Sequence, residues 1–229
     1  MSFQRSRLPT GISSLDRLLG GGFHTQEVNL VYGEATTGKT TLSLTTVFHH
    51  LRVNQSAMAV YLDIDNKLNV ARLEQIASSQ GKNLLKRIRL FTPESYSRQG
   101  DALEQLPEVA EGDMVVIDSI TGLYRGETEG AETTFRVNRE LNRQLGYLLE
   151  LAKTTGSTVL LTGQVRSRLD SGVVEPVAER LLRYWSSVIL RLEDSGRKGT
   201  RIAILEKPED SKTPIILTIN ESGMTEEQR

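Results

Sequence analysis

Residues 31–41 of the chain read VYGEATTGKTT, and positions 33–40 of this stretch fit the pattern G-x-x-x-x-G-K-[ST]. Gly33 and Gly38 let the backbone curl so that successive N–H groups face a phosphate, and a helix that begins there adds the positive end of its dipole. An apolar run precedes the loop, and TLSLTTVFHHL, which overlaps its end, can continue as a helix. The stretch therefore predicts a phosphate-binding loop between a strand and a helix; the alternative is a chance glycine-rich turn.

This loop supplies most of the candidate ligands for ATP and Mg²⁺. Lys39 would reach the β and γ phosphates, and the Thr40 hydroxyl would ligate Mg²⁺. Asp118 ends the apolar run MVVIDS, residues 114–119, as does a carboxylate that holds Mg²⁺ through water. The residues expected to bind the nucleotide at the loop are Gly33, Glu34, Ala35, Thr36, Thr37, Gly38, Lys39, Thr40 and Thr41. The sequence thus predicts ATP and Mg²⁺ as cofactors.

The composition is that of one compact domain. The chain has 229 residues, of which 38% are hydrophobic, so we expect a single domain over residues 1–229 with a flexible segment at residues 1–8. The absence of cysteine excludes disulfides, thiolate catalysis and Cys-ligated zinc. The formal net charge is −1, so any contact with nucleic acid requires a local basic patch. No apolar run is long enough to span a membrane, and we expect a cytoplasmic protein without a membrane partner.

Short apolar runs alternate with longer helical patterns, which is typical of a parallel sheet covered by helices. We expect strands over residues 27–32, 58–64, 87–91, 114–118 and 158–162, and helices from about residue 39 and over residues 69–80, 100–106 and 132–153. Beyond Trp185, the runs SVILRLE, TRIAILEK and PIILTINESG predict antiparallel strands at the C-terminal edge of the sheet. The predicted fold is α/β, with a mostly parallel central sheet flanked by helices.

Several segments together resemble one known family. They are TGISSLDRLLGGGF before the loop, YLDIDNK at the next strand, VIDSITGLYR at the Asp118 strand and LLTGQV two elements later. These segments resemble the RecA/RadA recombinase superfamily, and the resemblance covers the chain from Pro9 onward. EPVAERLLRYWSSVILRLE and RIAILEKP are similar to the short archaeal RadA paralogues that consist of the ATPase core alone. The resemblance implies a RecA-like P-loop NTPase core.

The resemblance also implies a catalytic role for Asp65, Gln164 and Lys39. Asp65 matches the residue that activates the attacking water, where most family members have glutamate. Its carboxylate would fall roughly 1.5 Å short, and a displacement of that order can lower the rate about a hundredfold. A turn or helix-start residue is the alternative for Asp65. Gln164 matches the strand-end glutamine that senses the γ-phosphate and passes its state to the DNA-binding loop.

A further residue, Arg72, matches the family's contact to the nucleotide base, and a second lies beside it. Arg72 matches the arginine that lies against the adenine ring, and Gln75, one turn later, shares that helix face. A solvated helix face is the alternative for both residues.

Two loops follow strand ends where such folds place ligands. The first, YRGETEGAETTFR at residues 124–136, contains Arg125 and Arg136, and the second, VRSRLDSGVVEP at residues 165–176, contains Arg166 and Arg168. The resemblance implies that both loops bind single-stranded DNA, and a solvated surface is the alternative. Since the second loop has no aromatic residue and the first offers only Tyr124 and Phe135, binding would be mostly electrostatic and salt-sensitive.

Filament formation is not expected from this sequence. Recombinases of the family that this chain resembles form filaments by inserting an aromatic-containing segment, upstream of the core, into a neighbouring subunit. Only eight residues precede Pro9, and SFQRS does not match the family's Phe-x-x-Ala element. We therefore expect a monomer or small oligomer.

Three functions remain open from the sequence. The first is a recombination accessory protein that binds ATP, hydrolyses it weakly or not at all, and acts with a RadA-type recombinase or other recombination proteins on single-stranded DNA. The second is a KaiC-like regulatory ATPase without a DNA role, which normally carries an acidic pair where this chain has Asp65. The third is an interaction module that nucleotide stabilises.

Overall fold

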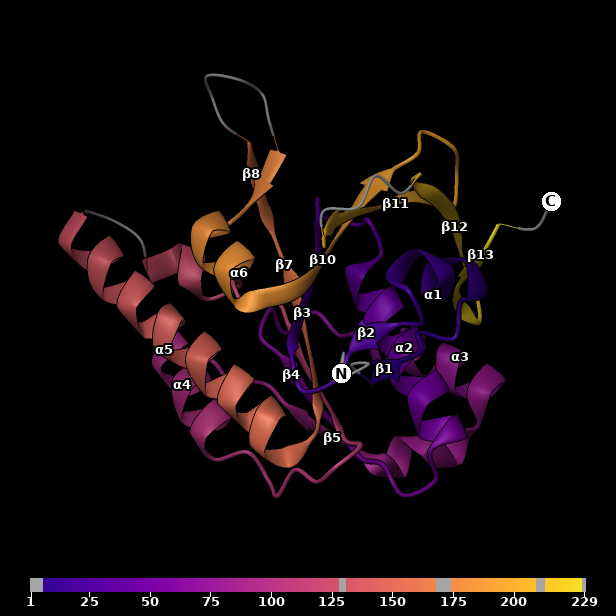
Figure 1. Ribbon diagram of the computed structural model, residues 1–229, viewed down its shortest axis with the longest axis horizontal. Coiled ribbons are helices and arrows are strands. Elements are labelled where there is room, and N and C mark those ends of the chain that lie inside the picture. The colour runs from indigo at the N-terminus through magenta and orange to yellow at the C-terminus, as the bar shows by residue number, and fades with distance from the viewer. Residues whose placement is uncertain (1–5, 128–130, 168–173, 209–212, 228–229) are drawn as a thin grey trace, which may run out of the picture.

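The structure is a computed structural model that describes residues 6–127, 131–167, 174–208 and 213–227. Within these residues the chain forms a central nine-stranded sheet with helices on both faces (Figure 1). The strand order across the sheet is β13-β12-β11-β10-β3-β7-β6-β4-β5. In chain order the strands are β3 (Val28–Gly33), β4 (Ala59–Asp63), β5 (Ile88–Phe91), β6 (Met114–Asp118), β7 (Thr158–Gly163), β10 (Ser186–Asp194), β11 (Thr200–Lys207), β12 (Ile215–Asn220) and β13 (Gly223–Glu226).

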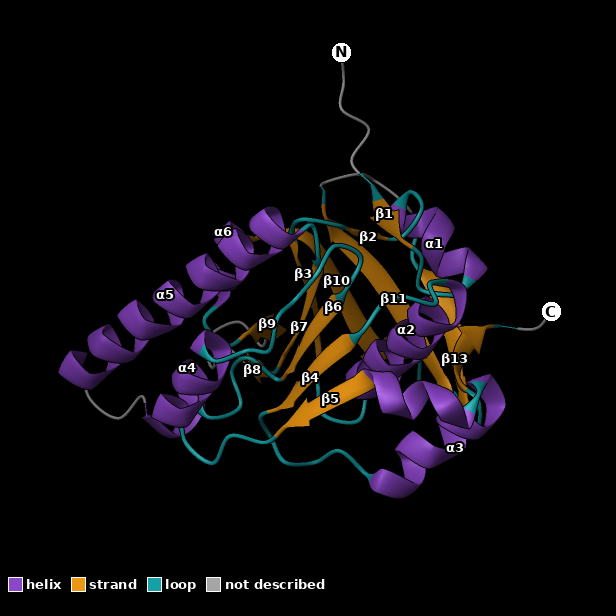
Figure 2. Ribbon diagram, turned by 90° about the horizontal axis from the view of Figure 1, so that it is seen from below, coloured by secondary structure: helices purple, strands orange, loops and turns teal. Residues whose placement is uncertain are grey.

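The helices divide between the two faces because alternate residues of each strand point to opposite sides of the sheet. The described helices are α1 (Ser13–Leu19), α2 (Lys39–Val53), α3 (Val70–Gln80), α4 (Tyr96–Glu104), α5 (Ala131–Thr155) and α6 (Glu179–Trp185), with the 3₁₀ helices η1 (Lys82–Arg87) and η2 (Tyr124–Glu127). Val31 and Val116 pack toward α1, α2 and α3, whereas Leu30 and Ile117 pack toward α4, α5 and α6. Figure 2 shows the sheet between these two helical layers. None of the helices in the described ranges is both long and apolar enough to cross a membrane.

The predicted fold class is confirmed, with one change at the C-terminal half. β10, β3, β7, β6, β4 and β5 run parallel to one another, and β11, β12 and β13 are antiparallel as predicted. The sequence predicts β10 among the antiparallel strands, but β10 pairs in parallel with β3 and only its other edge is antiparallel to β11. The reason is α6, which the sequence pattern did not predict: it precedes β10 and returns the chain so that β10 starts at the same end of the sheet as β3.

Two small strand pairs lie outside the central sheet. β1 (Arg7–Leu8) pairs with β2 (Phe23–His24), and β8 (Val165–Ser167) pairs with β9 (Val174–Pro176), both antiparallel. The prediction of a flexible segment over residues 1–8 is therefore wrong for Arg7 and Leu8, because Leu8 is buried in the core beside Phe23; residues 1–5 lie outside the described residues. Gly22 permits this close approach, since a Cβ there would lie 2.1 Å from the Leu8 carbonyl oxygen.

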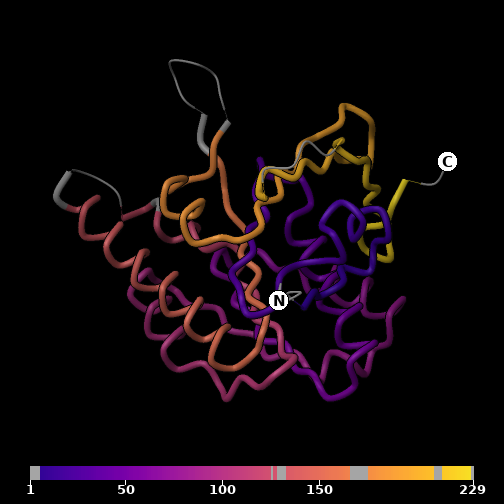
Figure 3. Tube along the Cα trace, viewed as in Figure 1, coloured from indigo at the N-terminus to yellow at the C-terminus, as the bar shows by residue number. Residues whose placement is uncertain are grey.

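The carboxyl ends of the parallel strands share one edge of the sheet, where open α/β folds bind ligands. Gly33, Asp63, Asp118 and Gly163 end four neighbouring strands there. The C-terminal strand β13 packs against both α1 and α2, and Figure 3 shows the yellow C-terminal segment beside the indigo N-terminal one. The N–H of Met224 in β13 donates to the Thr45 hydroxyl of α2 at 2.9 Å.

Candidate functional site

The predicted phosphate loop connects β3 to α2, and its backbone has the geometry of an anion site. Gly38 has φ 93°, and among the described residues no side chain caps the N-terminus of α2. The first N–H groups of this 15-residue helix therefore face the loop with the positive end of the helix dipole. Gly33 allows the chain to turn out of the sheet, since a Cβ there would lie 2.2 Å from the Leu192 carbonyl oxygen.

Lys39 lies across this loop. Its ammonium donates to the carbonyl oxygens of Gly33 at 2.9 Å and Glu34 at 2.7 Å. Burial lowers the pKa of Lys39, and the charges of Asp118 and Asp65 oppose that effect. The ammonium is thus the positive charge that faces two carboxylates at the carboxyl edge of the sheet.

Asp118 accepts hydrogen bonds from hydroxyl groups on three elements. The hydroxyl of Thr40 donates to Asp118 Oδ2 at 2.6 Å, the phenol of Tyr61 donates to the same oxygen at 2.7 Å, and the hydroxyl of Thr162 donates to Oδ1. Burial, followed by the charge of Asp118, raises the pKa of Tyr61 well above its ordinary value, so the phenol stays protonated and remains a donor. The peptide bond between Asp118 and Ser119 is cis.

The donor set at Thr40 and Asp118 fits Mg²⁺. Hydroxyl and carboxylate oxygens suit this ion, which usually keeps several of its waters in protein sites. The Thr40 hydroxyl donates to Asp118 at 2.6 Å, so an ion that this hydroxyl ligated would lie within reach of the carboxylate through one water. Thr40 lies in the uncapped first turn of α2, so the anion site and the metal site would be adjacent.

Asp65 and Gln164 meet at the same edge. The Gln164 amide donates to both Asp65 carboxylate oxygens, at 3.0 and 2.8 Å, and the Ser119 hydroxyl donates to Oδ2 at 3.2 Å. Gly122 leaves room for the carboxylate, because a Cβ there would lie 2.0 Å from Asp65 Oδ1. The structure therefore brings together the two residues that the sequence assigns to water activation and γ-phosphate sensing.

The turn and helix-start contacts after β4 are made by Asp63 and Asn69 and not by the Asp65 side chain. Asp63 holds the turn after β4, since its carboxylate accepts from the N–H groups of Lys67 and Leu68 at 3.1 and 2.8 Å. Asn69 is the N-cap of α3, where its side chain accepts from the Arg72 N–H at 3.2 Å. The Asp65 carboxylate instead faces Gln164.

Gln164 also forms the base of the hairpin made by β8 and β9. Its carbonyl oxygen accepts from the Val177 N–H at 2.9 Å, just beyond β9, and its own N–H donates to the Thr121 hydroxyl at 3.3 Å. One residue therefore contacts Asp65 through its side chain and the second predicted DNA loop through its backbone.

Arg72 and Gln75 lie together on α3, beside the turn between β12 and β13. The Arg72 guanidinium donates to Gln75 Oε1 at 2.6 Å and to the Asn220 carbonyl oxygen at 2.7 Å. Burial lowers the pKa of Arg72, and the charge of Glu221 opposes that effect. The guanidinium thus braces the C-terminal turn, which is packed against the loop: a Cβ at Gly38 would lie 2.6 Å from the Ile219 side chain.

The four predicted DNA-binding arginines are described unequally. Arg136 is exposed on the first turns of α5, while the side chains of Arg125 and Arg166 and the whole of Arg168 lie outside the described residues. Of the two aromatic residues of the first loop, Tyr124 is buried, with its hydroxyl donating to Asn138 Oδ1 at 2.8 Å. Phe135 is 72% exposed on α5 and is therefore the accessible one.

Three residues of the site have no local signal in the sequence. Tyr61 and Thr162 lie inside buried strands, and their contact with Asp118 depends on strand order, for which the sequence holds no local signal. Arg201 of β11 is a third, because its guanidinium donates to the Thr36 carbonyl oxygen of the phosphate loop at 3.0 Å.

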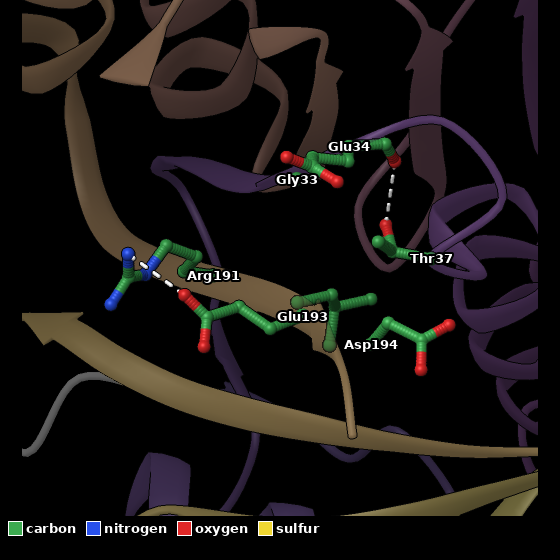
Figure 4. A pocket seen from close by; sticks show the side chains of 7 residues that line it. Gly33, Glu34, Thr37, Arg191, Glu193 and Asp194 are labelled. Carbon is green, nitrogen blue, oxygen red and sulfur yellow. Dashed lines mark hydrogen bonds and ion pairs between the residues drawn. The ribbon is translucent and has the colours of Figure 1, made fainter. Parts of the chain in front are cut away.

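A pocket of about 210 Å³ opens on the β10 side of the loop (Figure 4). It is lined by Gly33, Glu34, Thr37 and residues 191–194 of β10. Thr37 donates to the Glu34 carbonyl oxygen at 2.9 Å, and Arg191 pairs with Glu193 at 2.9 Å. Because Glu34, Glu193 and Asp194 line this pocket, it is less suited to phosphate than the opposite side of the loop, where Thr40 and Asp118 lie.

The fold and this site define a P-loop NTPase core of the RecA type. A model of the Rad51 family matches residues 4–227 of the chain. The DNA repair and recombination protein RadB of Thermococcus onnurineus is 35% identical over 205 residues, which cover 87% of this chain and 88% of that protein. RadB of Methanococcoides burtonii is 29% identical over 219 residues, covering 93% and 96%. A crystal structure of the RadB recombinase has a TM-score of 0.78 and 33% identity, covering 96% of this chain and 100% of the other. The chain therefore belongs to the Rad51 family.

Replacing Tyr61 by phenylalanine tests the hydrogen bonds to Asp118. Because the buried carboxylate loses one donor, we expect Tyr61→Phe to lower the free energy of unfolding by about 1.5–3 kcal/mol. Chemical denaturation with circular dichroism measures this change. Tyr184→Phe is the matched control, since Tyr184 is 75% exposed and its change should be near zero. Equal unfolding midpoints for the wild type and Tyr61→Phe would contradict the assigned role.

Proposed function

We propose that this chain is a RadB-like DNA repair and recombination protein that binds ATP and Mg²⁺ and acts on single-stranded DNA beside a RadA-type recombinase. The observation that carries the nucleotide part is the Thr40–Asp118 hydrogen bond at the uncapped N-terminus of α2. It supports a Mg²⁺ site, with Thr40 as a ligand and Asp118 acting through water, beside an anion site at the same point of the sheet edge. RadB is the name of the similar proteins, and this favours recombination over the KaiC-like regulatory function.

The loop residues from Gly33 to Thr41 would cradle the phosphates. Bound Mg²⁺ would neutralise phosphate charge, with Thr40 as a ligand and Asp118 held in position by Tyr61 and Thr162. Lys39 would exchange its two carbonyl acceptors for phosphate oxygens. Arg72 and Gln75 would contact the base from α3.

We further propose that ATP is hydrolysed weakly. Asp65 is one methylene shorter than the glutamate of most family members, and its two oxygens are already bonded to the Gln164 amide. A carboxylate in this arrangement is poorly placed to accept a proton from water. Nucleotide would then act mainly as a conformational ligand: contact with the γ-phosphate would break the Asp65–Gln164 bond and move the hairpin that Gln164 supports.

Single-stranded DNA would bind at the two loops that leave this edge. Arg125, Arg136, Arg166 and Arg168 are the proposed phosphate contacts, and a monomer or small oligomer is the proposed assembly. A RadA-type recombinase would bind the same DNA strand, so this chain would contact both the DNA and the recombinase.

Thermal denaturation with ATP and Mg²⁺ tests the nucleotide site. At a ligand concentration of a hundred times Kd, binding adds about 2.7 kcal/mol, which corresponds to a rise in Tm of roughly 5–10 °C for a chain of this size. We expect Lys39→Ala to lose most of this rise because the phosphates lose their cation. Lys153→Ala, in the last turn of α5, is the control and should keep it. A full rise in Lys39→Ala would refute the assigned site.

Steady-state ATP turnover tests the role of Asp65. We expect a low wild-type rate that Asp65→Glu increases by up to about a hundredfold, because the longer side chain restores the reach of the carboxylate. Asp65→Asn should lower the rate to background, and Asp101→Glu on α4 is the control. A fast wild-type rate that Asp65→Glu does not increase would show that Asp65 is already well placed.

The salt dependence of single-stranded DNA binding tests the second loop. Neutralising Arg166 and Arg168 together should lower the slope of log K against log salt by about 1.4, since each contact to single-stranded phosphate contributes about 0.7. Fluorescence anisotropy of a labelled oligonucleotide measures the slope. Arg17→Gln with Arg52→Gln is the matched control, because both are exposed on helices of the opposite face. An unchanged slope would remove these two arginines from the interface.

A further inference from the structure

Exposed aromatic and cationic side chains lie on α5 and α6, two helices that contact each other, and this set begins at Phe135 near the end of the first predicted DNA loop and extends beyond it. Phe135 of α5 and Tyr184 of α6 are 72% and 75% exposed, although both side chains are large and apolar over most of their surface. Arg139 of α5 and Arg180 of α6 are exposed as well. We call this set, together with Trp185, the α5–α6 surface.

Helical spacing aligns the α5 half of this surface. Phe135, Arg139, Asn142 and Gly146 are four, three and four residues apart, so they form one stripe along the helix. From Phe135 to Asn142 the stripe runs for about 10 Å, at 1.5 Å per residue. α6 lies over its far end, because the Trp185 indole N–H donates to Asn142 Oδ1 at 2.9 Å and a Cβ at Gly146 would lie 3.4 Å from the indole ring.

The α6 half carries a fixed pair of rings. Tyr184 and Trp185 pack edge to face, with ring centroids 5.2 Å apart and an interplanar angle of 88°. Because Asn142 and Gly146 hold Trp185 in position, the Tyr184 ring packs on a fixed indole while its own side chain remains exposed to solvent. Arg180 precedes Tyr184 by one helical turn and shares its side of α6. Figure 1 shows α6 beside α5 and at the base of the hairpin formed by β8 and β9.

The charges around these rings favour a polyanion. Two nearby carboxylates are already paired with arginines of their own helices, Glu140 with Arg143 at 2.7 Å and Glu179 with Arg183 at 2.8 Å. Arg139 lies between Phe135 and Asn142, so an apolar protein surface placed on the stripe would bury a guanidinium without an anionic partner. A nucleotide chain would cover the exposed rings and also supply anions to the arginines, because its bases stack on aromatic rings and its phosphates pair with arginine.

We propose that single-stranded DNA leaves the loops across the α5–α6 surface, with bases stacked on Phe135 and Tyr184 and with phosphates at Arg139 and Arg180. This inference rests on the proposed DNA function and adds to it a binding surface that depends on the bases. Electrostatic contacts from the loops would bind any polyanion, whereas the α5–α6 surface distinguishes a strand with bases from one without them.

The experiment compares a labelled oligo-dT with an abasic oligonucleotide of equal length, each titrated with the full chain by fluorescence anisotropy. We expect the wild type to bind oligo-dT more tightly than the abasic strand. Tyr184→Ala and Phe135→Ala should each weaken oligo-dT binding about tenfold and leave abasic binding unchanged. Tyr184→Phe should bind as the wild type does, and Val70→Ala, which removes an exposed apolar side chain of α3, is the matched control.

The single tryptophan of the chain gives a second readout at the same place. Because Tyr184 packs on Trp185, oligo-dT should quench the intrinsic tryptophan emission, and the abasic strand should quench it much less. Tyr184→Ala should lose most of this quenching. Arg139→Gln should weaken the binding of both strands alike, since both carry phosphates.

The outcomes separate this inference from the proposed function. Equal affinity for the two strands, unchanged in Tyr184→Ala, would keep the DNA function and overturn the α5–α6 surface. No binding of either strand at low salt with ATP and Mg²⁺ would overturn both. If Tyr184→Ala changed the sedimentation of the protein but not its affinity for oligo-dT, the surface would be a contact between protein chains and the inference would be wrong.

Discussion

The candidate site depends on one buried carboxylate that accepts hydrogen bonds from three elements. Asp118 is held by Thr40 at the start of α2, by Tyr61 of β4 and by Thr162 of β7. A buried carboxylate without hydrogen-bond donors would be costly, so these hydroxyls offset the cost of its burial and fix its orientation. The same bonds tie the first turn of α2 to the strands on either side of β6, and they set the position of the phosphate loop relative to the rest of the edge.

The site features that the sequence predicts from local patterns are those whose residues lie close together in the chain. The phosphate loop is one contiguous motif between a strand and a helix, and Asp118 ends an apolar run, so both could be found without knowing the fold. Tyr61 and Thr162 could not, because each looks like an ordinary member of a buried strand until β4 and β7 are known to flank β6. Asp65 and Gln164 lie 99 residues apart, and only the family resemblance suggested that they share a site.

The errors have a similar origin. α6 has seven residues, too few for a helical period to stand out, and without it the β-rich run that follows looks like another antiparallel strand. The exposure of Tyr184 has no local signal either, because it depends on Trp185 being held against Asn142 and Gly146 of another helix. Arg201 reaches the phosphate loop from β11, 165 residues further along the chain.

The backbone of Gln164 would give a physical route between the proposed nucleotide and DNA sites. Its side chain bonds to Asp65, its carbonyl oxygen accepts from Val177, and α6 begins at Glu179, two residues beyond Val177. A change at Asp65 would therefore reach the hairpin and α6 through one residue rather than through a chain of side chains. A ligand shifts such an equilibrium only by its difference in affinity for the two arrangements. Because such a coupling would be reciprocal, any factor by which bound ATP raised the affinity for single-stranded DNA would equal the factor by which bound DNA raised the affinity for ATP, without any need for hydrolysis.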